Sequence, residues 1–190
     1  MKNEFLIAGV DEVGRGCLAG PVVSAAVVLK KSVDINLLKD SKKIHFNKRI
    51  DISEHIKLNS FYSIGIASVE EILKLNILQA SLLSMERAIV NLPVKPKKIL
   101  IDGNFAPKGF KNCKTIVNGD EKIKVISAAS IIAKVFRDTL MIKLSEKYSN
   151  YAWEKNFGYG TKAHLNGLKK FGITSHHRKG FKPVHKILSQ

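Results

Sequence analysis

Cysteine is scarce in this sequence of 190 residues, which contains two. Cys17 and Cys113 stand far apart and form no paired CxxC spacing, so neither a zinc site nor a disulfide framework is indicated. Two such cysteines in a cytosolic chain are usually reduced. We therefore assign them no chemistry.

Long hydrophobic runs are also missing. No segment approaches the roughly 18 uninterrupted apolar residues of a membrane-spanning helix, and the N-terminus lacks a signal-peptide pattern. We expect a soluble, cytoplasmic protein that does not bind a membrane, and a monomer. With 45% apolar residues the chain can bury a core, and one domain over residues 1–190 is expected.

Acidic residues are few compared with basic ones. Sixteen Asp and Glu stand against thirty-two Lys and Arg, which gives a net charge of +16. A chain of this charge is expected to meet a polyanion, either nucleic acid or an anionic membrane surface. Charge alone favours nucleic acid without deciding between the two.

Apolar segments predict an α/β fold around a mixed sheet. Residues 5–10 are apolar without alternation, which is typical of a strand covered on both faces. β-branched and other apolar residues predict further strands at 21–29, 61–67, 99–101 and, more weakly, 115–117.

Two long helices are expected between and after these strands. Ser68 followed by Glu71 forms a capping-box pattern, and apolar residues recur at helical spacing towards Pro93. Its place between two strands predicts a right-handed parallel crossover. A second helix is expected over residues 127–148. From about residue 150, glycines and a proline separate short helical pieces, so a C-terminal helical extension is expected.

Three acidic side chains fall at the ends of predicted strands. Asp11 and Glu12 end the first strand, and Asp102 directly follows the strand at 99–101. Ligands of open α/β sheets gather at the carboxyl ends of strands, so these acids converge if the two strands are parallel neighbours. Alternatively each acid caps a turn, as Asp102 before Gly103 suggests. Clustered carboxylates repel each other and need a cation or a proton.

Hard carboxylate ligands suit Mg²⁺ or Mn²⁺. Two such ions roughly 4 Å apart activate water and stabilise a leaving oxygen at a phosphodiester, which suggests a nuclease or polynucleotidyl transferase. Consecutive strand residues point to opposite faces, however. We therefore expect the chain to turn already at Asp11 and Glu12, with Gly14 and Gly16 relaxing the backbone.

Five motifs in register resemble the ribonuclease HII family and span nearly the whole chain, so the sequence is identified as a member of it. Residues 11–16 (DEVGRG) and 18–23 (LAGPVV) are similar to the family's N-terminal signature. The other motifs follow in order: DSKK at 40–43, IDG at 101–103, GD at 119–120 with SAASIIAKV at 127–135 and Arg137-Asp138, and GYGT at 158–161 with His164.

The resemblance implies a ribonuclease H-like fold, a five-stranded mixed sheet flanked by helices. It also implies cleavage of the RNA strand of RNA·DNA hybrids, and 5′ of ribonucleotides embedded in duplex DNA, by two-metal hydrolysis with Mn²⁺ or Mg²⁺ that leaves 5′-phosphate ends. The implied metal-binding and catalytic residues are Asp11, Glu12, Asp102 and Asp120. The role of Asp120 rests on the resemblance alone, because Gly119-Asp120 looks like an ordinary turn.

Substrate contacts are expected near these acids. Only the 2′-hydroxyl distinguishes RNA from DNA at one nucleotide, and backbone groups of Gly14, Arg15 and Gly16 could meet it while Arg15 meets a phosphate. The resemblance places Tyr159 against the deoxyribonucleotide beside the scissile site. Lys42 and Lys43 resemble a basic contact to the nucleic-acid backbone. Alternatively, Gly14 to Gly16 form only a tight turn, Tyr159 is an ordinary surface aromatic residue, and the two lysines are solvated.

Other polar side chains receive more modest interpretations. Asp138, inside a predicted helix beside Arg137, is expected to form an ion pair or to support the metal ligands rather than to bind metal itself. His164 and the cluster His176-His177-Arg178 show no metal-binding pattern, so we expect them to support folding or to contact phosphate.

Two rival functions follow from the same residues. Ribonuclease HIII shares the fold and chemistry but carries an additional N-terminal domain, for which a first strand near Phe5 leaves no room. A nonenzymatic basic nucleic-acid-binding protein would use the lysines alone. Dependence of cleavage on a divalent metal separates that binder from a nuclease.

Overall fold

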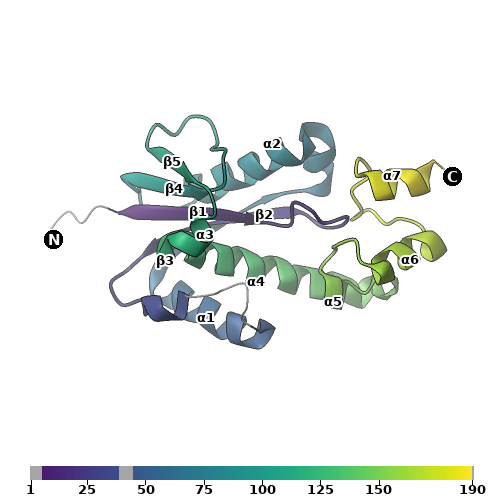
Figure 1. Ribbon diagram of the computed structural model, residues 1–190, viewed down its shortest axis with the longest axis horizontal. Helices are drawn as coiled ribbons and strands as arrows, with labels where there is room; N and C mark the ends of the chain where they lie inside the picture. The colour runs from purple at the N-terminus through teal and green to yellow at the C-terminus, as the bar shows by residue number, and fades with distance from the viewer. Residues whose placement is uncertain (1–5, 39–44, 190) are drawn as a thin grey trace.

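The computed structural model describes residues 6–38 and 45–189. A five-stranded sheet in the order β3-β2-β1-β4-β5 forms its centre (Figure 1). The strands are β1 (Ile7–Val13), β2 (Val22–Leu29), β3 (Ser60–Ala67), β4 (Lys98–Asp102) and β5 (Cys113–Ile116). All five predicted strands are therefore confirmed, with ends shifted by a few residues.

Helices cover both faces of the sheet, with α2 on one face and α4 and α1 on the other (Figure 1). The helices are α1 (Phe46–Leu58), α2 (Val69–Val90), α3 (Gly119–Lys122), α4 (Lys124–Lys147), α5 (Trp153–Asn156), α6 (Lys162–Phe171) and α7 (Lys182–Leu188). The described residues also form 3₁₀ turns at Ile35–Leu38 and Ser149–Tyr151. Within the described ranges, no helix is long and apolar enough to cross a membrane.

The sheet is mixed. β1 is antiparallel to β2 and parallel to β4, while β2 is antiparallel to β3 and β4 is parallel to β5. The two strands that carry the predicted acids are thus parallel neighbours. β3 and β4 also run in the same direction, as the crossover predicted, although β2 and β1 lie between them.

Both faces of β1 are buried, which explains its uninterrupted apolar sequence. Ala8 and Val10 pack into a cluster that contains Met85 of α2. On the opposite face, a Cβ on Gly9 would lie 2.2 Å from the Val125 carbonyl oxygen, so α4 passes directly over this glycine. Any larger residue at position 9 would push α4 away from the sheet.

Helix α2 starts as predicted but is not continuous. Ser68 and Glu71 form the complete capping box. At Asn76 the backbone leaves the helical region, with φ 67° and ψ 167°, and the Asn76 side chain accepts hydrogen bonds from the backbone N–H groups of Leu78 and Gln79. Asn76 therefore caps a second helical segment, a role that asparagine fills because it tolerates positive φ.

Helix α1 was not predicted from the sequence. Its three buried residues are Ile52, Ser53 and Ile56, and His45 at its N-cap makes no side-chain capping hydrogen bond. With so few apolar positions and no cap, the sequence gives little local signal. Packing against α4 and β3 places this helix.

The C-terminal helices build a second small core beside the end of the sheet. Trp153, Leu168 and Val184 pack there with Leu18 and Met141. An isolated bridge between Ala19 and His177 ties this layer to the segment that joins β1 to β2. The extension therefore contacts the chain directly after the acids of β1.

Candidate active site

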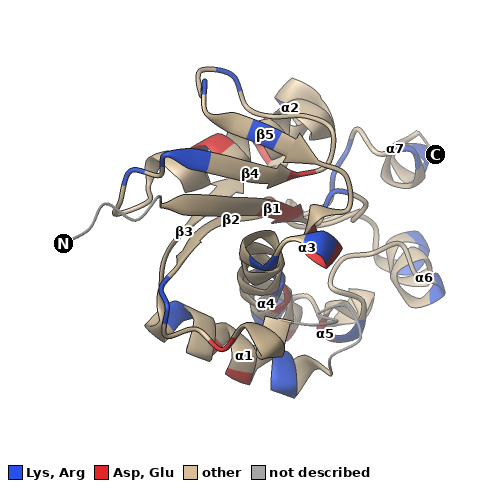
Figure 2. Ribbon diagram, turned by 60° about the vertical axis from the view of Figure 1, so that its left-hand side comes forward, with Lys and Arg blue, Asp and Glu red and all other residues tan. Residues whose placement is uncertain are grey.

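A cavity of about 350 Å³ opens at the carboxyl ends of β1 and β4. We call it the acidic pocket, because the carboxylates Asp11, Glu12, Asp102 and Asp120 all line it. Figure 2 shows acidic ribbon segments at the ends of β1 and β4, whereas Lys and Arg are spread over loops, helices and the strands β4 and β5. All four acids predicted from the sequence therefore meet in one place.

Asp11 and Glu12 reach the pocket from opposite faces of β1. The Asp11 side chain faces Ser130 of α4, which lines the same pocket. Glu12 is paired in the ladder with Ser24, whose hydroxyl contacts Ser84 of α2. The predicted turn at these acids is wrong: β1 continues through Val13, and regular alternation separates the two side chains.

The open edge of β1 allows both side chains to share the pocket. The register between β1 and β4 ends at Val10 and Ile101, so β1 extends past its neighbour. Asp102, the last residue of β4, lies beside this open edge. Carboxylates from either face of β1 can therefore approach Asp102 around the edge of the strand.

Asp120 enters the pocket on the one-turn helix α3 and is 8% exposed. Asn118 precedes the helix in the left-handed conformation, and the backbone N–H of Gly119 donates to Asp102 Oδ1 at 2.6 Å. A Cβ on Gly119 would lie 2.6 Å from the Ile126 side chain. The turn that the sequence suggested is present, and its hydrogen bond from Gly119 to Asp102 holds Asp120 close to Asp102.

Burial and the repulsion of neighbouring carboxylates disfavour the charged forms of Asp11 and Glu12. Burial, followed by the charge of Glu12, raises the pKa of Asp11 well above its ordinary value, and Asp102 adds to this shift. Burial also raises the pKa of Glu12, although its contact with Arg15 opposes the shift. A bound cation would favour the ionised forms.

The pocket fits a hard divalent cation. Glu12 Oε1 accepts from Arg15 at 3.1 Å, while Glu12 Oε2 is buried and has no hydrogen-bond partner in the described part of the chain. Among residues 6–38 and 45–189, no three acidic, His or Cys side chains are already closed around one ion position. Such an open set of oxygens suits Mg²⁺ or Mn²⁺, which keep waters and take up substrate oxygens.

The glycines after β1 differ in their surroundings. Gly14 has φ 93°, and a Cβ there would lie 2.2 Å from Nε of Arg137, so packing alone requires glycine. Gly16 is exposed, and a Cβ there would meet nothing closer than the Tyr159 ring, at 3.9 Å. Of the three predicted substrate residues in this loop, Arg15 and Gly16 face outward.

The sequence model of the family described as Ribonuclease HII matches residues 8–185. The chain belongs to the ribonuclease HII family. A relative from Pelagibacter ubique, itself a ribonuclease HII, is 55% identical over 185 residues, which cover 96% of this chain and 99% of that protein. Membership makes this chain an endoribonuclease, a hydrolase of the ribonuclease H class.

Solved structures agree with the ribonuclease HII assignment. The ribonuclease H2 of Pyrococcus horikoshii superimposes with a TM-score of 0.80 at 27% identity, covering 96% of this chain and 97% of that one. A Bst ribonuclease HIII superimposes with a TM-score of 0.73 at 18% identity, covering 97% of this chain and 70% of that one. The predicted ribonuclease H-like fold is confirmed.

Two basic residues that line the pocket were not predicted from the sequence. Lys134 and Arg49 line the acidic pocket together with Tyr159. Both pair with the buried Asp138, at 2.9 and 3.7 Å, and Lys134 Nζ lies 5.6 Å from the centroid of the Tyr159 ring. The ion pair expected for Asp138 is therefore confirmed. Lys134 stands four residues before Asp138 on α4, a spacing visible in the sequence, whereas Arg49 comes from α1, which no local pattern could indicate.

The other polar residues considered in the sequence are either buried or lie outside the described residues. His164, His177 and Arg178 are buried, which favours the role in folding that the sequence suggested. Lys42 and Lys43 lie outside the described residues.

Proposed function

We propose that this protein cuts the RNA strand of RNA·DNA hybrids and cuts on the 5′ side of ribonucleotides embedded in duplex DNA. Asp11, Glu12, Asp102 and Asp120 would hold two divalent metal ions for this reaction. The observation that carries the proposal is the gathering of these four carboxylates in one pocket of a chain with a net charge of +16.

The carboxylates supply what a phosphodiester hydrolase needs from its protein. Bound ions would activate a water molecule and stabilise the leaving oxygen, which gives 5′-phosphate and 3′-hydroxyl ends. The Bst ribonuclease HIII structure is described in complex with Mn²⁺, and oxygen ligands suit Mg²⁺ equally. Hydrogen bonds from Arg15 to Glu12 Oε1 and from the Gly119 N–H to Asp102 keep these two acids in place before substrate arrives.

Recognition of the ribonucleotide would fall to the loop beside the acids. The exposed backbone at Gly16 can approach a ribose, with Gly14 shaping the turn and Arg15 near a phosphate. Tyr159, 39% exposed at the rim of the pocket, would stack against the following deoxyribonucleotide. Lys42 and Lys43 would contact the nucleic-acid backbone.

We also propose that residues 1–190 act as one catalytic domain. The helices after residue 148 share a core with Leu18 and Ala19, and Tyr159 on this layer lines the same pocket as the acids of β1. Removal of the extension would therefore remove one wall of the site.

The test compares two substrates under three metal conditions. A DNA duplex with one ribonucleotide and an RNA·DNA hybrid are incubated with Mg²⁺, with Mn²⁺ and with chelator. We expect metal-dependent cleavage of both, on the 5′ side of the single ribonucleotide. Cleavage of the hybrid alone would contradict recognition of embedded ribonucleotides, and binding without cleavage in any metal would return the chain to the class of basic binders.

A further inference from the structure

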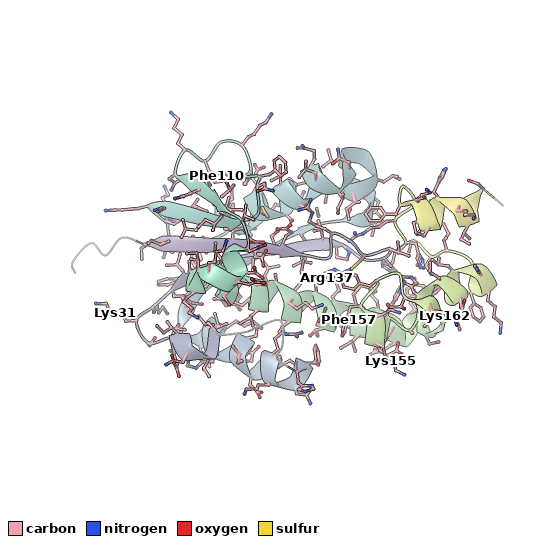
Figure 3. All side chains as sticks on the ribbon, in the orientation of Figure 1. Lys31, Phe110, Arg137, Lys155, Phe157 and Lys162 are labelled. Atoms are coloured by element: carbon pink, nitrogen blue, oxygen red, sulfur yellow. The ribbon has the colours of Figure 1, made fainter. Side chains whose placement is uncertain are left out.

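Two arginine side chains are buried beneath the loop that follows β1. Arg137 of α4 is 0% exposed and Arg178 is 1% exposed. Neither forms an ion pair among the residues that the structure describes. Each guanidinium instead donates three hydrogen bonds to backbone carbonyl oxygens. Figure 3 shows Arg137 between the end of the sheet and the C-terminal helices.

The two arginines share the Pro21 carbonyl but otherwise bind different parts of the loop. Arg137 donates to the carbonyls of Ala19, Pro21 and Phe157, at 2.8 to 3.0 Å. Arg178 donates to Arg15 at 2.9 Å, and also to Gly20 and Pro21. Only Arg178 therefore contacts the peptide between Arg15 and Gly16, across 163 positions of sequence.

That contact fixes the direction of one N–H group. No described peptide bond is cis, and in a trans peptide the carbonyl of one residue points opposite to the N–H of the next. Because the Arg15 carbonyl points inward to Arg178, the Gly16 N–H points outward. Gly16 is exposed, and no acceptor for its N–H is found within residues 6–38 and 45–189.

We propose that Arg178 is a positioning residue for ribose recognition: by binding the Arg15 carbonyl, it holds the Gly16 N–H ready to donate to the 2′-hydroxyl of the bound ribonucleotide. This inference rests on the proposed cleavage at embedded ribonucleotides. It also explains the choice of residue, because a guanidinium offers several donors in a fixed plane whereas lysine offers a single point charge. Arg178 itself touches no substrate.

The matched variants are Arg178→Lys and Arg137→Lys. Both remove a buried guanidinium with three carbonyl partners, but only the first releases the Arg15 carbonyl. Each is combined with Asp11→Asn, which stops cleavage, and affinity is measured for a DNA duplex with one ribonucleotide and for the same duplex without it. The ratio of the two affinities reports on the 2′-hydroxyl, and a melting curve reports on folding.

We expect Arg178→Lys to lower this ratio by about fivefold, the effect of one misplaced hydrogen bond, and Arg137→Lys to leave it unchanged. An unchanged ratio in folded Arg178→Lys, or an equal loss in both variants, would overturn the proposal. If the Asp11→Asn parent itself shows no preference for the ribonucleotide, the proposed recognition of embedded ribonucleotides fails instead.

Hydrogen exchange at the Gly16 amide tests the orientation without altering either arginine. We expect this amide to exchange rapidly in the free protein, and to become protected when the Asp11→Asn protein binds the ribonucleotide-containing duplex but not plain DNA. Slow exchange in the free protein, or protection by both duplexes, would overturn the proposal even if Arg178→Lys does not fold.

Discussion

His164 and His177 face each other through their Nε2 atoms, 3.0 Å apart, and both side chains are completely buried. Neighbouring groups fix where each ring carries its proton. The Thr174 backbone N–H donates to His177 Nδ1, so the His177 proton is on Nε2 and is donated to His164. His164 Nδ1 donates to the Tyr159 carbonyl, and its Nε2 also accepts from Trp153.

Both histidines must therefore be neutral for this network to form. An additional proton on either ring would place two N–H groups against each other. The chain of hydrogen bonds ends at the backbone of Tyr159, so a buried polar network in the C-terminal layer holds the residue expected to contact substrate.

We predict that acid destabilises the protein through His177. Burial lowers the pKa of His177 from 6.5 to about 3, so the unfolded chain binds this proton first. Its contribution to stability is complete above pH 6.5 and is lost as the pH falls towards 3. Between pH 7.5 and pH 5 the loss is about 2 kcal/mol from this residue. Melting temperatures measured across this range should fall less steeply in His177→Gln; an equal slope would contradict the prediction.

Asp11→Asn should abolish cleavage while leaving duplex binding within a few-fold of the unaltered protein. The change removes a ligand charge from the acidic pocket but leaves the basic surface intact. Single-turnover cleavage and duplex affinity at one fixed salt concentration measure the two effects. Retained turnover would disprove the assignment of Asp11 as a metal ligand.

Glu12→Gln should have opposite effects on stability without and with metal. Without divalent ions, neutralising this buried carboxylate relieves its repulsion with Asp102 and should stabilise the fold by on the order of 1 kcal/mol. The unaltered protein should gain thermal stability when Mn²⁺ or Mg²⁺ is added, because ligands that bind only the folded state stabilise it. The variant should gain much less. A KCl solution of equal ionic strength is the control, and equal gains in both proteins would show that Glu12 binds no metal.

Tyr159→Ala should weaken cleavage at a single embedded ribonucleotide by about tenfold or more, since stacking on one base is worth roughly 1–3 kcal/mol. Tyr159→Phe keeps the ring and serves as the control. The measurement is kcat/KM on the duplex with one ribonucleotide. If Tyr159→Ala cuts this junction as fast as Tyr159→Phe does, the ring plays no part in recognition.

Local sequence patterns determined the strands, the capping box at Ser68 and the convergence of Asp11 with Asp102. These features depend on periodicity and on strand ends, which a few consecutive residues encode. The family motifs added Asp120, which its own surroundings disguise as a turn. The sequence did not indicate helix α1 or the break of α2 at Asn76, because apolar spacing is weak in the first and uninterrupted in the second.

Tertiary structure decided how the site is assembled. Asp11 and Glu12 share a pocket although they lie on opposite faces of β1, because the pairing of β1 with β4 ends at Val10. Arg178 reaches the Arg15 carbonyl from the far end of the chain. Such contacts depend on which elements become neighbours after folding. Arg178 looks ordinary in the sequence. It is buried and bonded to backbone carbonyls only after those elements have packed together.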